Sequence, residues 1–183
     1  MKIHAFLVAA TVILCAGRAH GMSTAPLPLI IRQIDHLPAA CIPVSDAKSM
    51  ALKFTGVWED SHGQSEFSSQ WGIEWVPGVK PLVLRPGQCV VFGQAIDGYR
   101  PVGDMHPLKA GRTYNFSLRE LNKANDWSGI RYSGMFCVQK NTDETLSYLP
   151  YVRHEDGTVT YPACGRYIGS PPAADGIVPP GMP

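Results

Sequence analysis

The side chains best able to do chemistry in this chain are its cysteines. Four of them lie beyond the apolar start of the chain: Cys41, Cys89, Cys137 and Cys164. No two of these form a close Cys-x-x-Cys pair, the spacing that zinc sites use, so we expect no metal. In an exported chain an even number of cysteines favours disulfide bonds. Spacing alone leaves three connectivities open.

The start of the chain predicts export. Lys2 is followed by an apolar run over residues 5–16 and then by small residues, with cleavage expected after Ala19 or Gly21. The run of about 12 apolar residues is too short to cross a bilayer, which takes roughly 20. We therefore assign residues 1–21 to a signal peptide and expect no membrane span.

Cys15 lies inside this signal peptide and raises the alternative of a lipid anchor. A lipoprotein signal carries a small residue directly before its cysteine, whereas Leu14 stands there. The anchor is therefore disfavoured, and we expect a soluble periplasmic protein. A lipoprotein anchored through Cys15 and a fully secreted protein are the alternatives.

Residues able to catalyse a reaction show no recognisable pattern. The histidines beyond the signal peptide are far apart, each in a predicted turn or loop: His36, His62, His106 and His154. Adjacent carboxylates also fall in predicted turns: Glu59-Asp60, Asp143-Glu144 and Glu155-Asp156. Glycosidases instead need two carboxylates about 5 to 9 Å apart across a cleft. We expect no enzyme, no catalytic residue and no cofactor; a small hydrolase assembled in space is the alternative.

Alternating apolar residues predict β-strands along most of the chain. The strongest alternation places Trp71, Ile73 and Trp75 on one face of a strand over residues 70–76. Turn residues separate such segments at short intervals. Only residues 119–128 are compatible with a helical turn.

Two glycines are predicted to interrupt strands. In residues 50–58, Met50, Leu52 and Phe54 share one face, and Gly56 is expected to form a bulge. Gly134 is expected to form a similar bulge in the strand over residues 130–139.

A turn followed by a strand occurs twice in similar form. Pro86 and Gly87 predict a tight turn before Cys89 and an apolar strand. Residues 108–116 repeat the order of leucine, base, glycine and aromatic found in residues 84–92. This repetition indicates two similar strand beginnings in one β domain.

These patterns predict one all-β domain over residues 29–168. About nine or ten short strands with little helix favour an immunoglobulin-like or fibronectin-like β-sandwich, stabilised by disulfides, with a small β-barrel as the alternative. Residues 22–28 are predicted to be a linker, and residues 169–183, rich in Pro and Gly, a disordered tail. The net charge is +1 without a basic block, so no nucleic-acid partner is expected.

The connection over residues 94–106 is long for a hairpin and is the first candidate for binding. It contains Asp97, Tyr99 and Arg100, and Tyr and Arg often anchor protein interfaces. The alternative is that Tyr99 packs back on the sandwich. The polar loop over residues 59–65 is a second candidate contact.

Four short motifs allow a comparison with a known family. They are Ala40-Cys41-Ile42-Pro43-Val44, the segment from Leu84 to Gly93, the segment from Pro107 to Tyr114 and the segment from Tyr132 to Val138. In this order they resemble small exported bacterial proteins described as type VI secretion immunity periplasmic lipoproteins. The resemblance covers about Leu29 to Lys140. Ala40 stands where that family has Pro, and Phe92 where Tyr is usual.

The resemblance implies a strand-rich protein that binds an incoming toxin in the periplasm and blocks it. The family offers no catalytic residues to carry over. We therefore expect a binding protein with a protein partner, the cognate toxin; an envelope structural or assembly module is the alternative. Among the three connectivities we expect Cys41 to pair with Cys89 and Cys137 with Cys164.

Overall fold

A computed structural model describes residues 25–46, 48–60, 69–122, 124, 128–154, 156 and 158–165. Across these ranges the chain forms thirteen strands and no helix. The signal peptide expected over residues 1–21 and the tail expected over residues 169–183 lie outside the described residues. The number of strands exceeds the expected nine or ten because several have only two or three residues.

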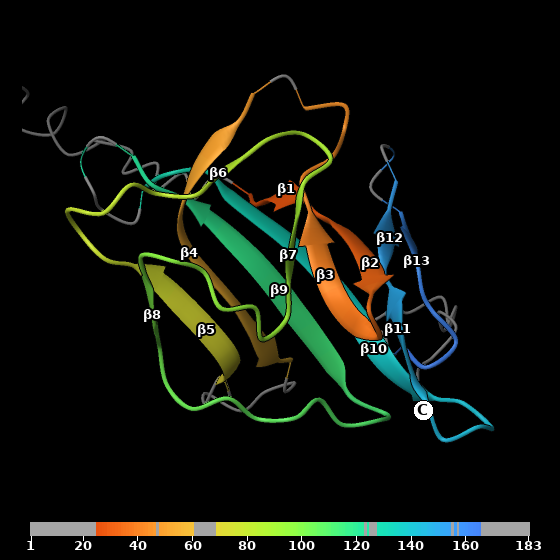
Figure 1. The fold of residues 1–183 in the computed structure, drawn as a ribbon. Helices are drawn as coiled ribbons and strands as arrows, with labels where there is room; N and C mark the ends of the chain where they lie inside the picture. The colour runs from red at the N-terminus through yellow and green to blue at the C-terminus, as the bar shows by residue number, and fades with distance from the viewer. Residues whose placement is uncertain are drawn as a thin grey trace, which may run out of the picture.

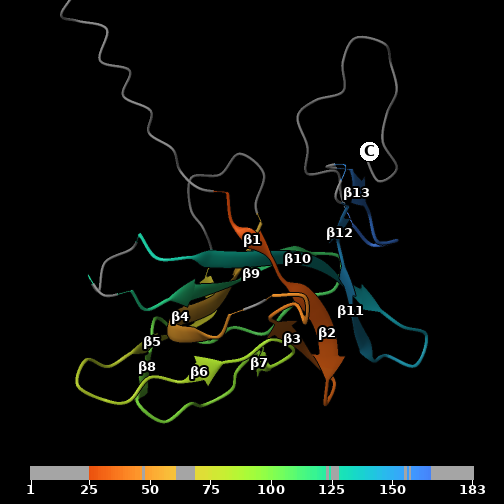
Figure 2. The same cartoon turned by 90° about the horizontal axis from the view of Figure 1, so that it is seen from above.

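The strands form two stacked sheets and a small hairpin (Figures 1 and 2). The large sheet has the order β1 (Leu27–Pro28), β10 (Arg131–Lys140), β9 (Thr113–Glu120), β4 (Met50–Glu59), β5 (Ser69–Trp75) and β8 (Tyr99–Pro101). In addition, β11 (Leu146–Pro150) pairs with β10, and β6 (Val83–Leu84) pairs with β4. The small sheet consists of β2 (Ile30–Ile34), β3 (Leu37–Cys41) and β7 (Cys89–Val91). The hairpin joins β12 (Val152–Arg153) to β13 (Val159–Thr160).

The core lies between the two sheets, and Figure 2 shows the small sheet covering one face of the large one. On β9 every second side chain, Tyr114, Phe116 and Leu118, is fully buried. Trp71 contacts the ring of Phe116 edge to face at 6.0 Å and the ring of Phe92 at 5.7 Å. The chain is thus an all-β sandwich, as predicted, and its sheets do not close into the alternative barrel.

The predicted face of β4 is wrong beyond Leu52. A register shift between Leu52 and Phe54, rather than at Gly56, places an extra residue opposite β9. This bulge turns Phe54 to the outer face and brings Thr55 and Val57 into the core, where both are fully buried. A second shift against β5 occurs between Val57 and Trp58.

Gly134 does not form the predicted bulge. The pairing of β10 with β9 runs in continuous register from Arg131 to Cys137. A Cβ atom on Gly134 would lie 3.0 Å from Ile31 and Leu29. Glycine is therefore needed there because β2 crosses closely over β10.

The predicted turns before β7 and β9 are present. Gln88 N–H donates to the carbonyl of Arg85 at 3.0 Å, and Gly87 has φ 83°, as a type II turn requires. Before β9, the buried hydroxyl of Tyr114 accepts a hydrogen bond from Lys109 N–H at 2.9 Å. This contact is of the same kind as the tyrosine corner of immunoglobulin-like sandwiches. Burial raises the pKa of this hydroxyl.

Two disulfides join Cys41 to Cys89 and Cys137 to Cys164, which are the pairs expected from the sequence. The first joins directly opposed residues of β3 and β7 inside the small sheet. The second ties the segment after the β12–β13 hairpin to the buried middle of β10. Both bonds indicate an oxidising, extracytoplasmic environment.

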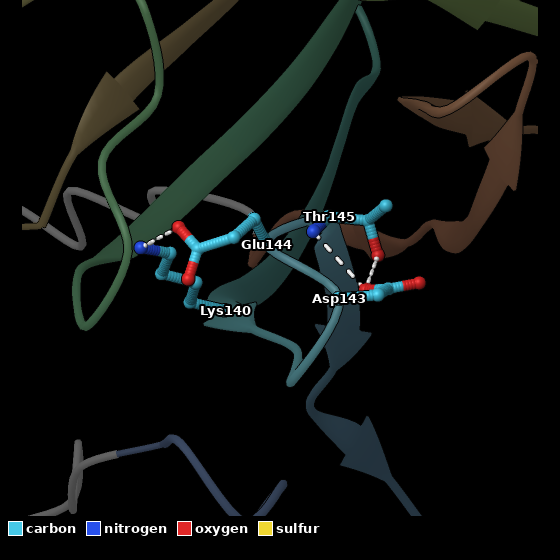
Figure 3. A network of polar contacts seen from close by, with 4 residues as sticks. All are labelled: Lys140, Asp143, Glu144 and Thr145. Atoms are coloured by element: carbon cyan, nitrogen blue, oxygen red, sulfur yellow. Dashed lines mark hydrogen bonds and ion pairs between the residues drawn. The ribbon is translucent and has the colours of Figure 1, made fainter.

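The adjacent acids Asp143 and Glu144 both form polar contacts within the turn between β10 and β11 (Figure 3). Asp143 accepts hydrogen bonds from the hydroxyl of Thr145 at 2.6 Å and from its N–H at 3.1 Å, while Lys140 pairs with Glu144. These hydrogen bonds lower the pKa of Asp143. Asp156 makes the same two contacts with Thr158 in the β12–β13 hairpin. Both acids therefore serve as turn-forming groups.

Two further expectations differ from the structure. Leu27 and Pro28, assigned to a linker, form β1 and pair in parallel with Tyr132 and Ser133 of β10. The first two residues of the expected helical turn, Arg119 and Glu120, extend β9, because Glu120 N–H donates to Ile130 O at 2.8 Å. Within the described part of the chain, no helix is long and apolar enough to cross a membrane.

Candidate functional site

The segment over residues 94–106 is an edge of the large sheet and not a free loop. Tyr99, Arg100 and Pro101 form β8 and pair with β5. Beyond β8, Val102 N–H donates to Gly72 O at 2.9 Å, and His106 N–H donates to Gln70 O at 2.7 Å. The long loop expected from the sequence thus satisfies the backbone groups along the outer side of β5.

The three predicted binding residues of this segment differ in what they contact. The half-buried Tyr99 donates its hydroxyl to Leu52 O at 2.5 Å and accepts from Leu82 N–H at 3.2 Å. Burial raises the pKa of this hydroxyl. Arg100 pairs with Glu74 at 3.2 Å, and Asp97 is exposed in the preceding turn. Tyr99 therefore packs back on the sandwich, while Arg100 and Asp97 remain accessible; their binding role stays a prediction.

The second predicted contact, over residues 59–65, is described only at Glu59 and Asp60. Glu59 pairs with Arg112 at 3.3 Å. Residues 61–65, including His62, lie outside the described residues. The predicted contact role of this loop therefore stays a prediction.

The described histidines lie apart from one another. His36 occupies the turn between β2 and β3 with φ 63°, His106 is exposed beside β5, and His154 contacts Thr160 at 2.7 Å. Among the described residues, no group of three His, Cys, Asp or Glu side chains is placed to hold a metal ion.

A surface with hydrogen-bonded polar side chains lies on the outer face of the large sheet. Cross-strand pairing places Gly72, Gly56, Ser117 and Ser133 in one row across β5, β4, β9 and β10. The rows on either side carry larger side chains. On one side Phe54, Arg119 and Arg131 align, and on the other Trp58, Asn115 and Met135 align.

A hollow forms where the small side chains lie between the larger ones. It has a volume of about 360 Å³ and is lined by Pro26, Trp58, Asn115, Ser117, Arg131 and Ser133. At the other end of the row, the ring of Phe54 packs over Gly56 and Gly72. The hollow therefore lies at the end of the row that carries the two serines.

Hydrogen bonds fix the polar groups of the hollow. Ser133 donates its hydroxyl to Asn115 Oδ1 at 2.8 Å, and the buried Ser117 donates to Tyr132 O at 3.0 Å. The amide oxygen of Asn115 is thus used as an acceptor, which leaves its NH₂ group available as a donor. The positions of these side chains are set before any ligand binds.

The hollow carries positive charge. Arg131 is exposed and lies directly opposite Arg119 in the β9–β10 pair. Burial and the neighbouring Arg131 lower the pKa of Arg119. The described residues that line the hollow include no carboxylate. An anionic group next to the exposed Arg131 guanidinium would be stabilised by its charge.

None of the residues that line the hollow was singled out as a binding residue from the sequence. The alternation along β9 does predict that Asn115 and Ser117 lie on its polar face. It does not indicate that Ser133 and Trp58 flank them, because strand neighbours across long separations are set by the tertiary structure. The sequence feature that could have indicated the hollow is the small polar residues Ser117 and Ser133 on two of the predicted strands.

Comparison of the chain with protein-family models, with curated proteins and with solved structures finds no match in any of the three. The resemblance to type VI secretion immunity proteins therefore rests on the short motifs alone.

Proposed function

We propose that this chain is an exported binding protein of the periplasm that acts as an immunity protein against a secreted antibacterial toxin. The observation that carries the binding role is the hollow on the outer face of the large sheet. Its lining includes Trp58 and Arg131, and these residue types are enriched where protein interfaces concentrate their binding energy. The toxin as ligand follows from the motif resemblance.

The mechanism is steric. A rigid sheet that places fixed hydrogen-bond donors and an indole around a hollow loses little conformational entropy when a partner binds. A toxin held against this face has its own active surface covered. Inhibition of this kind needs no catalytic group in the immunity protein. It requires a complex with the toxin that dissociates slowly.

A cell competition assay tests this function. Cells lacking the gene should be killed by toxin-delivering sister cells, and expression of the exported protein should restore survival. A version without residues 1–21 should stay in the cytoplasm and fail to protect, which serves as the matched control. Full survival of the deletion strain against sister cells would disprove the immunity role.

Affinity capture from the periplasm separates this function from the alternative. The mature protein should retain a toxin encoded by the same strain, in a complex that also forms from the two purified proteins. Capture of envelope components instead, with no toxin binding in the purified system, would favour a structural or assembly module.

A further inference from the structure

The hollow presents donors to a ligand. Asn115 offers its NH₂ group, because its oxygen already accepts from Ser133. Arg131 and Trp58 also line the hollow, and their side chains carry guanidinium N–H groups and an indole N–H as donors. The ligand that satisfies such a set is an acceptor with several lone pairs, and an anion satisfies it best.

Two acids, Glu120 and Asp46, have partners outside the hollow. Glu120 accepts a hydrogen bond from Ile130 N–H at 3.3 Å. Asp46 accepts from the hydroxyl of Tyr132 at 2.6 Å, and Tyr132 lies on the inner face of β10. Neither acid lines the hollow. Among the described residues that line the hollow, no carboxylate is therefore present to pair with Arg131.

From this geometry we infer that the hollow binds the carboxylate of an aspartate or glutamate side chain on a protein partner. A guanidinium donates two parallel hydrogen bonds to a carboxylate, and the Asn115 amide supplies a third donor nearby. Trp58 and Pro26 provide apolar walls for the methylene groups that carry the carboxylate. The inference rests on the proposed function, because it takes the partner to be a protein.

Nuclear magnetic resonance with two matched compounds tests the site directly. N-acetyl-glutamate amide carries only a side-chain carboxylate, and N-acetyl-glutamine amide has the same shape without charge. The first should shift the indole N–H signal of Trp58 and the backbone amides of Asn115, Arg131 and Ser133. For so small a compound a dissociation constant on the order of millimolar is expected. The second should produce no saturable shift at these positions.

Two variants test the residues. Arg131→Gln should weaken binding of the glutamate compound roughly tenfold or more, because it removes the charged donor. Ser133→Val should abolish binding by filling the floor of the hollow. Arg85→Gln, an exposed arginine in the turn before β7, is the control and should bind as the wild type does. The spectra themselves report whether each variant is folded.

Several results would overturn the inference. One is equal binding of the glutamine compound, and another is unchanged binding by Arg131→Gln. Inorganic phosphate binding more tightly than the glutamate compound would assign the hollow to a phosphorylated ligand. Shifts confined to residues outside the hollow would also refute it.

The competition assay distinguishes failure of this inference from failure of the proposed function. Arg131→Gln should protect cells less well than Arg85→Gln at equal protein levels. If both protect as well as the wild type, the hollow is not the toxin site although the immunity function stands. If the glutamate compound binds as expected and the deletion strain survives attack, the site stands and the immunity function fails.

Discussion

Thr55 is a buried polar residue whose hydroxyl lacks a hydrogen-bond partner within the described residues. It faces the core because the bulge between Leu52 and Phe54 exchanges the two faces of β4. Its cross-strand neighbours are Ile73 and Leu118, both apolar. Burying a hydroxyl without a partner costs about 1 to 3 kcal/mol.

We expect Thr55→Val to raise the free energy of unfolding by about 1 kcal/mol, because valine has nearly the same shape and no unsatisfied hydroxyl. Urea denaturation measures this change. Thr113→Val is the matched control, since the hydroxyl of Thr113 lies 3.2 Å from that of Tyr151. This control should lose about 0.5 to 1.5 kcal/mol. Destabilisation of both variants by the same amount would contradict the account of Thr55.

Tyr99 shows why residue type alone is a weak guide to binding. Tyrosine suits an interface because a large apolar ring ends in a hydroxyl, and these same properties suit an anchor for an edge strand. The hydroxyl of Tyr99 donates a hydrogen bond to Leu52 O and accepts one from Leu82 N–H, and these two bonds hold β8 to the sheet. Which of the two roles a tyrosine takes depends on what its hydroxyl can reach.

At the level of elements, the β4–β5 pair depends on two opposed glycines. Gly56 and Gly72 face each other across the strands, and the ring of Phe54 covers both. A Cβ atom on Gly56 would lie 2.9 Å from that ring and 3.0 Å from Trp71 O. A Cβ atom on Gly72 would lie 3.5 Å from the ring, which is ordinary contact.

Gly56→Ala is therefore expected to destabilise the protein by about 1 to 3 kcal/mol, because the ring or the strand must shift. Gly72→Ala should change stability by less than about 1 kcal/mol, since the new methyl group fits and alanine restricts the unfolded chain. Thermal and urea denaturation of the two variants provide the comparison. Equal losses would mean that Phe54 does not pack over Gly56 as described.

At the scale of the whole molecule, the two disulfides hold different parts of the fold. Cys41–Cys89 spans 48 residues and lies within the small sheet, which covers one side of the core. Cys137–Cys164 spans 27 residues and tethers a peripheral segment next to the β12–β13 hairpin. Figure 2 shows this hairpin extending beyond the stacked sheets.

Replacing Cys41 and Cys89 together by alanine should lower global stability by about 2 to 4 kcal/mol, because the unfolded chain gains freedom. Replacing Cys137 and Cys164 should have a smaller global effect. It should instead speed hydrogen exchange in β12 and β13 while β4 and β9 stay protected. Equal loss of protection throughout the sandwich in both variants would contradict this division.

The β class, the main turns and several inner faces can be predicted from the amino-acid sequence. Alternation with a period of two is a local property, so Trp71 and Ile73 could be placed directly on one face of their strand, and both are buried. The Pro86-Gly87 turn follows from the conformational limits of two adjacent residues. The disulfide pairs agree with expectation, although spacing alone allowed three connectivities.

Which side chains become neighbours on the outer face depends on the packing of the whole fold. The bulge between Leu52 and Phe54 reverses the faces of β4, and no residue type marks it in advance. The hollow exists because Trp58, Ser117 and Ser133 come from strands far apart in the sequence. Local alternation sets the face on which a side chain lies, whereas its neighbours depend on strand order and register, which follow from packing the whole core.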